Sequence, residues 1–275
     1  MQPLPSTLAL AGKVLVVIGG TSGLGLSAAR AFVQAGARLV VVGLDRESVA
    51  ATATELGSDA HVFEADASQP DAAGKSIQDA RTRYGGFDGL FHVAGGSGRR
   101  WGDGPLHELT NEGWRATLDL NLSSVMYSNR AAVRAFLEQR KGGTILNTGS
   151  VLASSPSPHF FSTHAYAAAK SALAGLTLSC AAYYAPQNIR FNVLAPGLIA
   201  TPMSRRAQAD PCISAFIHTK QPLDGGRIGQ PQDIAAAAVF FMSDASRFVT
   251  GQVLNVDGGW SLTEGQFLAR EADAE

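Results

Sequence analysis

The segment covering residues 13–35 restricts the fold more than any other part of the chain, because it reads as a buried strand, a glycine-rich turn and a helix in succession. The apolar run 13–18 leads into Gly19-Gly20-Thr21-Ser22-Gly23-Leu24-Gly25, and an amphipathic helical pattern follows over residues 24–35. Glycines in such a turn let the backbone approach a pyrophosphate group, and the N-terminus of the following helix favours an anion. This order of elements favours a dinucleotide-binding site.

The rest of the chain continues the alternation of short apolar runs with longer helical patterns. Further strands are expected at residues 38–43, 60–64, 86–92, 144–149, 189–194 and 252–256, and further helices at residues 46–56, 71–84, 111–140, 163–185 and 231–243. Strands that alternate with helices indicate a parallel sheet joined by crossover connections. We therefore expect an α/β fold: a doubly wound, Rossmann-type parallel sheet of about seven strands with helices on both faces, in a single domain spanning residues 1–275.

Two long segments interrupt this alternation. Residues 95–107 are rich in glycine and arginine, and residues 201–229 carry prolines, a basic pair and a short helical pattern. Open parallel sheets bind their ligands in loops beyond the carboxyl ends of the strands, so we expect residues 201–229 to be a substrate-loop insertion. Residues 263–275 are polar and acidic and are expected to form a loosely held C-terminal tail.

Composition and charge restrict the partners and the compartment. The chain has 22 basic and 23 acidic residues, a net charge of -1, and no basic block, which argues against nucleic acid as a partner. Charged residues make up only 16% of the chain, which favours a homo-oligomer. The apolar run 14–18 is too short for a signal peptide or a membrane span, so we expect a cytoplasmic protein without membrane contact. Cys180 and Cys212 lack a metal-ligand spacing and are expected to be ordinary reduced residues, and no metal is expected.

The spacing of Gly19, Gly23 and Gly25 is G-x-x-x-G-x-G, one residue longer than the usual dinucleotide fingerprint. It resembles the short-chain dehydrogenase/reductase family, and the resemblance extends from residue 12 to about residue 262. The family commonly has a threonine where this chain has Ile18. The resemblance implies an NAD(P)-dependent oxidoreductase that interconverts a secondary alcohol and a ketone.

The residues after the second expected strand bear on the choice between NAD and NADP. A carboxylate accepts hydrogen bonds from a ribose 2'-hydroxyl and repels a 2'-phosphate, whereas a cation does the reverse. The acidic position usual in the family corresponds to Gly43, but Asp45 lies 20 residues after Gly25, the separation that the general fingerprint predicts. Arg46 is the alternative, as a ligand for a 2'-phosphate, and Asp45-Arg46 can also be read as a solvated helix start. The absence of a basic residue at Ser22 adds to a preference for NAD, with NADP left open.

The resemblance also implies further contacts with the cofactor. Asp66 and Ala67 would meet the adenine, with a simple turn aspartate as the alternative for Asp66. In His92-Val93-Ala94-Gly95 the family's Ala-Gly pair is kept, while His92 replaces a structural asparagine and is interpreted as a hydrogen-bonded core histidine. In the segment 196–201, Ile199 would offer its backbone and Thr201 its hydroxyl to the nicotinamide. The complete set of expected cofactor-binding residues is Gly19, Thr21, Ser22, Gly23, Leu24, Gly25, Asp45, Arg46, Asp66, Ala67, Ala94, Gly95, Tyr166, Lys170, Pro196, Gly197, Ile199 and Thr201.

The expected catalytic pair is Tyr166 and Lys170, which are one helical turn apart and therefore lie on one helix face. An ammonium near a phenol favours the phenolate, so Lys170 is predicted to lower the pKa of Tyr166 toward working pH. Tyr166 would then exchange a proton with the substrate oxygen while hydride moves to or from the cofactor. Such a pair is common on helices and by itself is a weak indication of catalysis. Its position after a glycine loop and a strand-end serine makes the catalytic interpretation stronger.

Two further catalytic residues follow from the family's motif order. Ser150 ends an expected strand and would donate to the substrate oxygen, although 16 residues separate it from Tyr166, about three more than is usual. Ser154, within the longer segment, is the rival, and a helix-capping role is the plain alternative for Ser150. Asn121 lies inside an expected helix, where asparagine is a poor helix former. In the family this asparagine distorts the helix and holds a water linked to the lysine; an exposed polar position is the alternative.

Substrate contacts are expected from the irregular segments. Aromatic and cationic side chains there would suit an apolar or aromatic carbonyl compound with an acid group; they are Trp101, Phe160, Phe161 and His164, with Arg99, Arg100, Arg205 and Arg206 nearby. The segment 255–259 resembles the family's last strand, which lies at a subunit contact and implies a homotetramer. Two alternatives to the dehydrogenase remain: a catalytically silent dinucleotide-binding sensor or scaffold, and an isomerase or lyase that uses the nicotinamide transiently.

Overall fold

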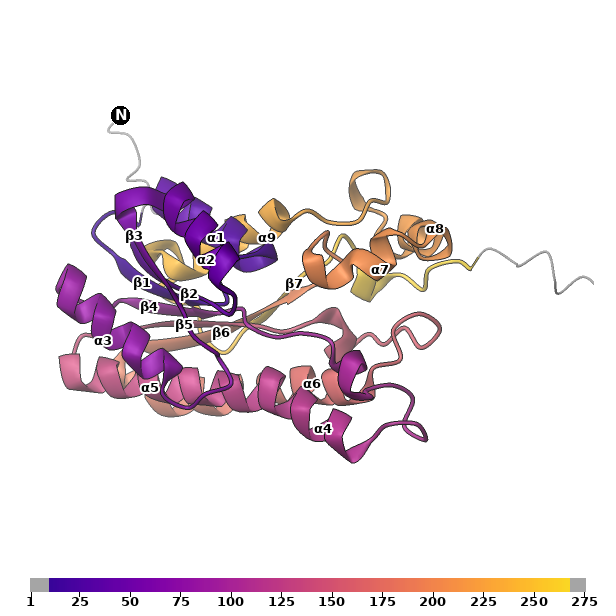
Figure 1. The fold of residues 1–275 in the computed structure, drawn as a ribbon, viewed down its shortest axis with the longest axis horizontal. Coiled ribbons are helices and arrows are strands. Elements are labelled where there is room, and N and C mark those ends of the chain that lie inside the picture. Colours follow the sequence, from indigo (N-terminus) through magenta and orange to yellow (C-terminus); the bar gives the residue numbers. More distant parts are fainter. Residues whose placement is uncertain (1–9, 268–275) are drawn as a thin grey trace, which may run out of the picture.

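A computed structural model of the chain describes residues 10–267, which form one seven-stranded parallel sheet flanked by helices (Figure 1). The strands are β1 (Val14–Ile18), β2 (Arg38–Gly43), β3 (Ala60–Glu64), β4 (Gly89–His92), β5 (Gly143–Thr148), β6 (Ile189–Pro196) and β7 (Val253–Val256). Their order across the sheet is β3-β2-β1-β4-β5-β6-β7. Strand order reverses between β1 and β4, which is where doubly wound sheets bind dinucleotides. The expected α/β class and strand number are confirmed.

Helices cover both faces of the sheet, as expected. The main helices are α1 (Gly23–Gln34), α2 (Arg46–Leu56), α3 (Ala72–Tyr84), α4 (Asn111–Leu118), α5 (Ser124–Gln139), α6 (His164–Tyr184) and α9 (Pro231–Met242). Figure 1 shows α1, α2 and α9 on one face, and α3, α5 and α6 on the other. None of the helices in residues 10–267 is long and apolar enough to cross a lipid bilayer.

The sheet is held by two apolar cores, because successive side chains of a strand point to opposite faces. Leu15 and Val17 of β1 join Phe32 of α1 in the first core. Val16 and Ile18 join Phe136 of α5 in the second. All six of these side chains are fully or almost fully buried. An uninterrupted apolar run such as β1 is therefore what a strand covered on both faces requires.

The segment 201–229, for which one short helical pattern was expected, forms two α-helices beyond one end of the sheet. They are α7 (Arg205–Gln208) and α8 (Pro211–Lys220), and Figure 1 shows them beside the strand ends. A third apolar cluster joins them to the rest of the molecule, with Phe216 and Ile217 packed against Trp260. Asp210 caps α8 by accepting hydrogen bonds from the backbone N–H groups of Cys212 and Ile213.

Two other expectations need correction. The helix expected over residues 111–140 contains a π-helical turn, Asp119–Ser123, between α4 and α5. Residues 263–267, expected in a loose tail, contact α8: Gln266 donates from its backbone to Thr219 Oγ1 over 2.7 Å, and Phe267 stacks on Phe216. The segment is held by this hydrogen bond and by the ring contact with Phe216, which is a member of the third apolar cluster. The remainder of the expected tail, residues 268–275, lies outside the described residues.

Candidate active site

The glycine loop lies against the end of β4, at the switch point of the sheet. A side chain at Gly25 would overlap the carbonyl oxygen of Gly19, and one at Gly19 would come within 2.6 Å of the Ala94 backbone nitrogen. Helix α1 begins at Gly23, and the side chain of Ser22 makes no capping hydrogen bond to it. A close-packed loop leading into a helix N-terminus without a side-chain cap fits the pyrophosphate of a dinucleotide.

Position 43, at the end of β2, has no room for the acidic side chain that is usual in the family. A Cβ atom there would overlap the side chain of Thr21 in the glycine loop. Asp45, two residues later, is exposed and caps α2 by accepting a hydrogen bond from Ser48 N over 2.9 Å. The hydroxyl of Ser48 bonds to both Asp45 Oδ2 and Thr21 Oγ1, so the aspartate is linked to the loop. The side-chain and backbone hydrogen bonds from Ser48 hold the pKa of Asp45 below its usual range, so it is a carboxylate at neutral pH.

Two more of the expected adenosine contacts lie at the same end of the sheet. Arg46 is exposed and is the first residue of α2. Asp66 follows β3 and accepts a hydrogen bond from Ser68 N over 2.8 Å, which makes it a turn aspartate as well as a candidate for binding adenine. Burial opposes ionisation of Asp66, but its hydrogen bonds from Ser68 outweigh this and lower its pKa.

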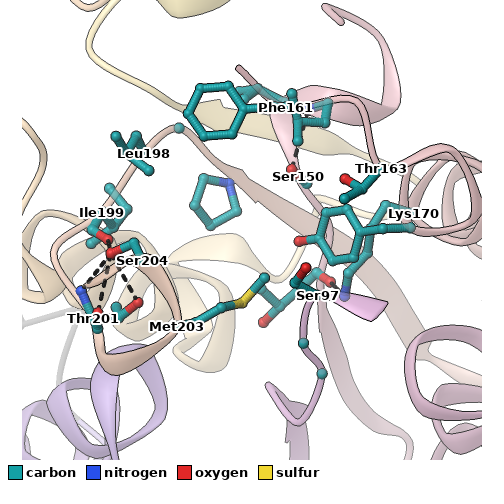
Figure 2. A pocket seen from close by; sticks show the side chains of 18 of the residues that line it. Ser97, Ser150, Phe161, Thr163, Lys170, Leu198, Ile199, Thr201, Met203 and Ser204 are labelled. Atoms are coloured by element: carbon teal, nitrogen blue, oxygen red, sulfur yellow. Dashed lines mark hydrogen bonds between the residues drawn. The ribbon is translucent and has the colours of Figure 1, made fainter. Parts of the chain in front are cut away.

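A cavity of about 280 Å³ opens beside the loop at the carboxyl ends of β4, β5 and β6. Figure 2 shows Ser150, Thr163 and Lys170 on one side of it, with Leu198, Ile199 and Thr201 on the opposite side. The expected site residues that line it are Leu24, Gly95, Ser150, Tyr166, Lys170, Pro196, Gly197, Ile199 and Thr201. The remaining expected cofactor residues lie outside this lining. The structure therefore brings the expected nicotinamide contacts together with three of the four expected catalytic residues, while Asn121 lies behind the lining.

Tyr166 and Lys170 lie one turn apart on α6, and both are buried. Lys170 Nζ lies 5.7 Å from the centre of the Tyr166 ring and donates a hydrogen bond to the Thr148 carbonyl at the end of β5 over 2.8 Å. That bond fixes the ammonium at the base of the cavity. The helix thus presents a phenol to the cavity, and the strand end orients the cation beside it.

The titration of this pair is governed by burial. Burial raises the pKa of Tyr166, and a hydrogen bond with Ser150 opposes that rise. Burial also lowers the pKa of Lys170 to about 8. The sequence predicted that Lys170 would lower the pKa of Tyr166; among the protein's own groups, loss of hydration outweighs any such effect.

Ser150 is the serine that meets Tyr166, and Ser154 is not. Ser150 is 8% exposed and lines the cavity, whereas Ser154 is exposed and lies outside the lining. The Ser150 hydroxyl accepts a hydrogen bond from Leu152 N over 3.2 Å, so it also caps a short 3₁₀ turn. Accepting that bond leaves the hydroxyl proton available to donate to a ligand. The capping role and the catalytic role are therefore compatible.

Asn121 lies in the π-turn between α4 and α5 and is completely buried, which excludes the exposed alternative. Its side chain pairs with the backbone of Gly96: Oδ1 accepts from Gly96 N over 3.1 Å, and Nδ2 donates to Gly96 O over 2.9 Å. A Cβ atom on the adjacent Gly95 would lie 2.9 Å from Asn121 Oδ1 and 3.3 Å from Lys170 Nζ. The turn therefore directs the asparagine toward the lysine across Gly95.

His92 is a buried core histidine in the structure, as interpreted from the sequence. Nδ1 is 2.9 Å from the Ser128 hydroxyl, and Nε2 is 3.1 Å from the Ala94 carbonyl. A carbonyl can only accept, so Nε2 carries the proton and Nδ1 accepts from Ser128. Burial, followed by the charge of Lys170, lowers the pKa of His92 to about 3. His92 is therefore neutral at physiological pH.

Asp103 is a functional candidate that the sequence analysis missed. It belongs to the irregular segment after β4, is 4% exposed, and accepts hydrogen bonds from Ala165 N and Tyr166 N, each over 3.0 Å. The carboxylate thus caps the helix that carries the catalytic pair, where the residue before α6, Thr163, provides no side-chain cap. In the sequence, only the lack of a capping residue before α6 hints at a remote cap. Asp103 lies 62 residues before Ala165, so nothing local connects the two.

The segment after β6, which the sequence predicts to contact the nicotinamide, is held by hydrogen bonds within it. Ser204 Oγ donates to the Ile199 carbonyl over 2.6 Å and accepts from Thr201 N over 3.0 Å, as Figure 2 shows. Ser204 also lines the cavity, and the sequence analysis did not identify it. Its hydroxyl fixes the segment in a turn through two backbone groups.

The aromatic and basic residues expected to face a substrate divide into two groups. Arg99, Phe161 and Arg206 line the cavity. The others do not belong to the lining: Trp101, Phe160, His164, Arg100 and Arg205. Trp260 lines it as well and was not expected there; its ring packs against Phe161 at 5.7 Å between centres.

Comparison with known proteins agrees with this geometry. A family model described as enoyl-(acyl carrier protein) reductase matches residues 19–261. The chain is 37% identical to "Momilactone A synthase" of Oryza sativa subsp. japonica, over 94% of this chain and 93% of the relative. It is 33% identical to "3beta-hydroxysteroid dehydrogenase 2" of Eggerthella lenta, over 92% and 96%. A solved short-chain type dehydrogenase/reductase from Mycobacterium ulcerans superposes with a TM-score of 0.86 at 32% identity, over 94% and 92% of the two chains.

Proposed function

Because this chain belongs to the short-chain dehydrogenase/reductase family and is an NAD(P)-dependent oxidoreductase of alcohols and ketones, we propose that it acts on a secondary alcohol of an aliphatic ring. The observation that carries the catalytic assignment is the meeting of Ser150, Tyr166 and Lys170 in one cavity. The apolar wall of Phe161, Leu198 and Trp260 supports a ring-shaped substrate. The hydroxysteroid substrate named for one relative has the same character.

The cofactor would lie along the carboxyl ends of the strands. We assign its pyrophosphate to the glycine loop and the start of α1, its adenosine to Asp45 and Asp66, and its nicotinamide to the segment carrying Ile199 and Thr201. When bound, the nicotinamide accepts hydride from the alcohol carbon or gives it to the ketone carbon. NAD is the proposed cofactor, because the carboxylate of Asp45 would accept from a ribose hydroxyl and repel a phosphate. Arg46 beside it is the group that would favour NADP instead.

The protein's own groups then manage the proton. Tyr166 takes the hydroxyl proton in oxidation and returns it in reduction. Ser150 donates to the substrate oxygen and stabilises the negative charge that develops there. Lys170 places a positive charge beside the phenol, which favours the phenolate during transfer. Asn121, held next to Gly95, is assigned to a proton path from Lys170 toward solvent.

The first test is substitution of the proposed acid–base group. Tyr166→Phe is expected to lower the turnover of ring alcohols by a factor of about 10² to 10⁴, because the proton acceptor is lost. Calorimetric titration with NADH and NADPH is expected to show unchanged cofactor binding in this variant and tighter binding of NADH in the parent protein. Tyr184→Phe, at the far end of the same helix, is the matched control. Retained turnover in Tyr166→Phe would contradict the assignment, and tighter NADPH binding would reverse the cofactor preference.

We further propose that the protein is a homotetramer of the cytoplasm. Strand β7 is an edge of the sheet, and its Val253 and Leu254 are 46% and 40% exposed. An apolar edge of this kind is normally covered in a soluble protein. The two cysteines, Cys180 and Cys212, are free thiols, which suits a reducing compartment.

A further inference from the structure

Two arginines from distant parts of the chain converge on one backbone oxygen at the active-site cavity. Arg99, in the segment after β4, donates from Nη2 to the Phe160 carbonyl over 3.4 Å. Arg206, in α7, donates from Nη2 to the same carbonyl over 3.0 Å. Both side chains line the cavity that also contains Ser150 and Tyr166. The two guanidinium groups therefore lie side by side at the site where the substrate is proposed to bind.

Neither arginine has a carboxylate partner within residues 10–267. Neither belongs to any of the ion pairs formed in that part of the chain. Burial lowers the pKa of Arg99, and the adjacent charge of Arg206 lowers it further, while Asp103 opposes both. Both oxygens of Asp103 already accept backbone hydrogen bonds from α6. Two like charges thus lie side by side next to an apolar cavity, and no ion pair within residues 10–267 neutralises either of them.

The N–H donors of the two guanidinium groups that the Phe160 carbonyl does not use suit a carboxylate. Each guanidinium has five N–H donors, and the shared carbonyl uses one donor of each. Arg206 Cζ lies 5.8 Å from the centre of the Phe161 ring, so the cationic edge borders the apolar wall directly. Planar guanidinium groups bind carboxylates through paired hydrogen bonds, which are stronger than those between neutral groups.

We propose that Arg99 and Arg206 bind a carboxylate carried by the substrate, so that the enzyme acts on ring alcohols or ketones that bear an acid group. The inference deepens the proposed function and rests on it for the reacting end of the substrate. The anion would also lower the repulsion between the two arginines, and its binding would hold α7 against the segment that contains Phe160.

The chain provides matched controls at adjacent positions. Arg100 lies over the Trp101 ring, 4.0 Å from its centre, and Arg205 is exposed at the start of α7. Neither lines the cavity. Arg100→Gln and Arg205→Gln therefore remove one positive charge from the same segments without removing a proposed ligand.

Binding is tested first, apart from turnover. We would titrate the protein by calorimetry, in the presence of NAD⁺, with 4-oxocyclohexanecarboxylate and with its uncharged methyl ester. The parent protein is expected to bind the acid more tightly, and Arg99→Gln and Arg206→Gln are each expected to weaken binding of the acid about tenfold or more. Affinity for the ester is expected to stay constant, the two control variants to match the parent protein, and Arg206→Lys to retain part of the preference.

Three outcomes would overturn the carboxylate site: equal affinity for acid and ester, no measurable binding of the acid, or equal weakening of both ligands in the arginine variants. The last would mean that the arginines only hold the Phe160 segment in place. Turnover of the same two ketones with NADH and NADPH is a separate measurement. Tight, arginine-dependent binding of the acid without turnover of either ketone would contradict the proposed function while leaving the carboxylate site supported.

Discussion

At the scale of single residues, burial sets the chemical state of the groups around the active site. His92, Tyr166 and Lys170 are all buried, and loss of hydration favours the neutral form of each. It lowers the pKa of His92 and of Lys170 and raises the pKa of Tyr166. The residue types were visible in the sequence, whereas the direction of each shift was not, because hydration depends on neighbours from other elements. Tyr166 shows this most clearly, since its pKa moves opposite to the prediction made from its spacing to Lys170.

His92 should make the protein sensitive to mild acid. Its pKa is about 3 in the fold and 6.5 ordinarily, so the unfolded chain binds a proton between these values that the folded chain does not. Stability is therefore lost as the pH falls below 6.5, by about 2 kcal/mol at pH 5. In His92→Asn the asparagine side chain can replace both hydrogen bonds but cannot be protonated. Between pH 7 and pH 5 the free energy of unfolding should therefore fall by about 2 kcal/mol less in this variant than in the parent protein.

The measurement is urea unfolding at the two pH values and at one protein concentration. His107→Asn is the control, because it removes a histidine whose side chain is exposed in the folded protein. An acid-induced loss in His92→Asn equal to that of the parent protein would show that His92 is not the sensitive group.

At the scale of elements, α6 depends on a segment remote in sequence for the position of its catalytic face. The spacing of Tyr166 and Lys170 predicted correctly that one helix carries both. The helix start is fixed by Asp103, which binds the backbone N–H of Tyr166 itself. A local pattern cannot reveal such a contact, because it forms only when the segment after β4 packs against the start of α6.

Asp103→Asn tests this positioning role. An amide offers one oxygen in place of two, so one N–H at the start of α6 loses its acceptor, and the negative charge at the helix N-terminus is also lost. We expect the free energy of unfolding to fall by about 1–2 kcal/mol and turnover to fall about tenfold, with NADH affinity unchanged. Steady-state kinetics, cofactor titration and urea unfolding of the same preparation would measure the three effects.

Thr110→Ala is the matched control, since Thr110 caps α4 by accepting a hydrogen bond from Gly113 N over 2.8 Å. It should lower stability by a similar amount and leave turnover close to that of the parent protein. If both variants lost turnover in proportion to their stability, Asp103 would be a structural cap only.

At the scale of the whole molecule, the sheet ends in an apolar edge at β7. The side chain of Leu178 on α6 is 57% exposed and lies close to Gly251, just before the strand, so the apolar surface extends beyond the edge itself. Low charge content in the sequence favoured an oligomer, and the exposed edge is the surface that we propose for it. Composition gives only an average over the whole chain. The position of an interface depends on which apolar side chains are exposed, and this is visible only in the structure.

Leu254→Lys is expected to break the proposed tetramer. A charge on the apolar edge would be desolvated in the interface, which costs far more than it does on a free surface. Light scattering after size-exclusion chromatography should give a tetramer for the parent protein and a smaller species for the variant, with the circular dichroism spectrum unchanged. Lys75→Glu, on the exposed face of α3, is the control. A monomeric parent protein would contradict the proposal directly.

The sequence by itself determined the elements and the chemistry available to them. Alternating apolar runs and helical patterns predicted the seven parallel strands, because burial on both faces of a strand has a direct signature in residue type. Motif order predicted a cofactor-binding glycine loop and the catalytic residues Ser150, Asn121, Tyr166 and Lys170, and these roles stay predictions. Both kinds of feature are read along the chain, since they depend on residue types, spacing and order and not on contacts between distant segments.

Only the tertiary structure decided which of these groups meet and in what state. It separated Arg99 and Arg206, which line the cavity, from Arg100 and Arg205, which do not. It also placed Thr21 where a side chain on residue 43 would lie, which accounts for the glycine at that position. The reason is physical: hydration, steric exclusion and the convergence of charges depend on distances between segments that are far apart in sequence, and those distances exist only once the sheet has formed.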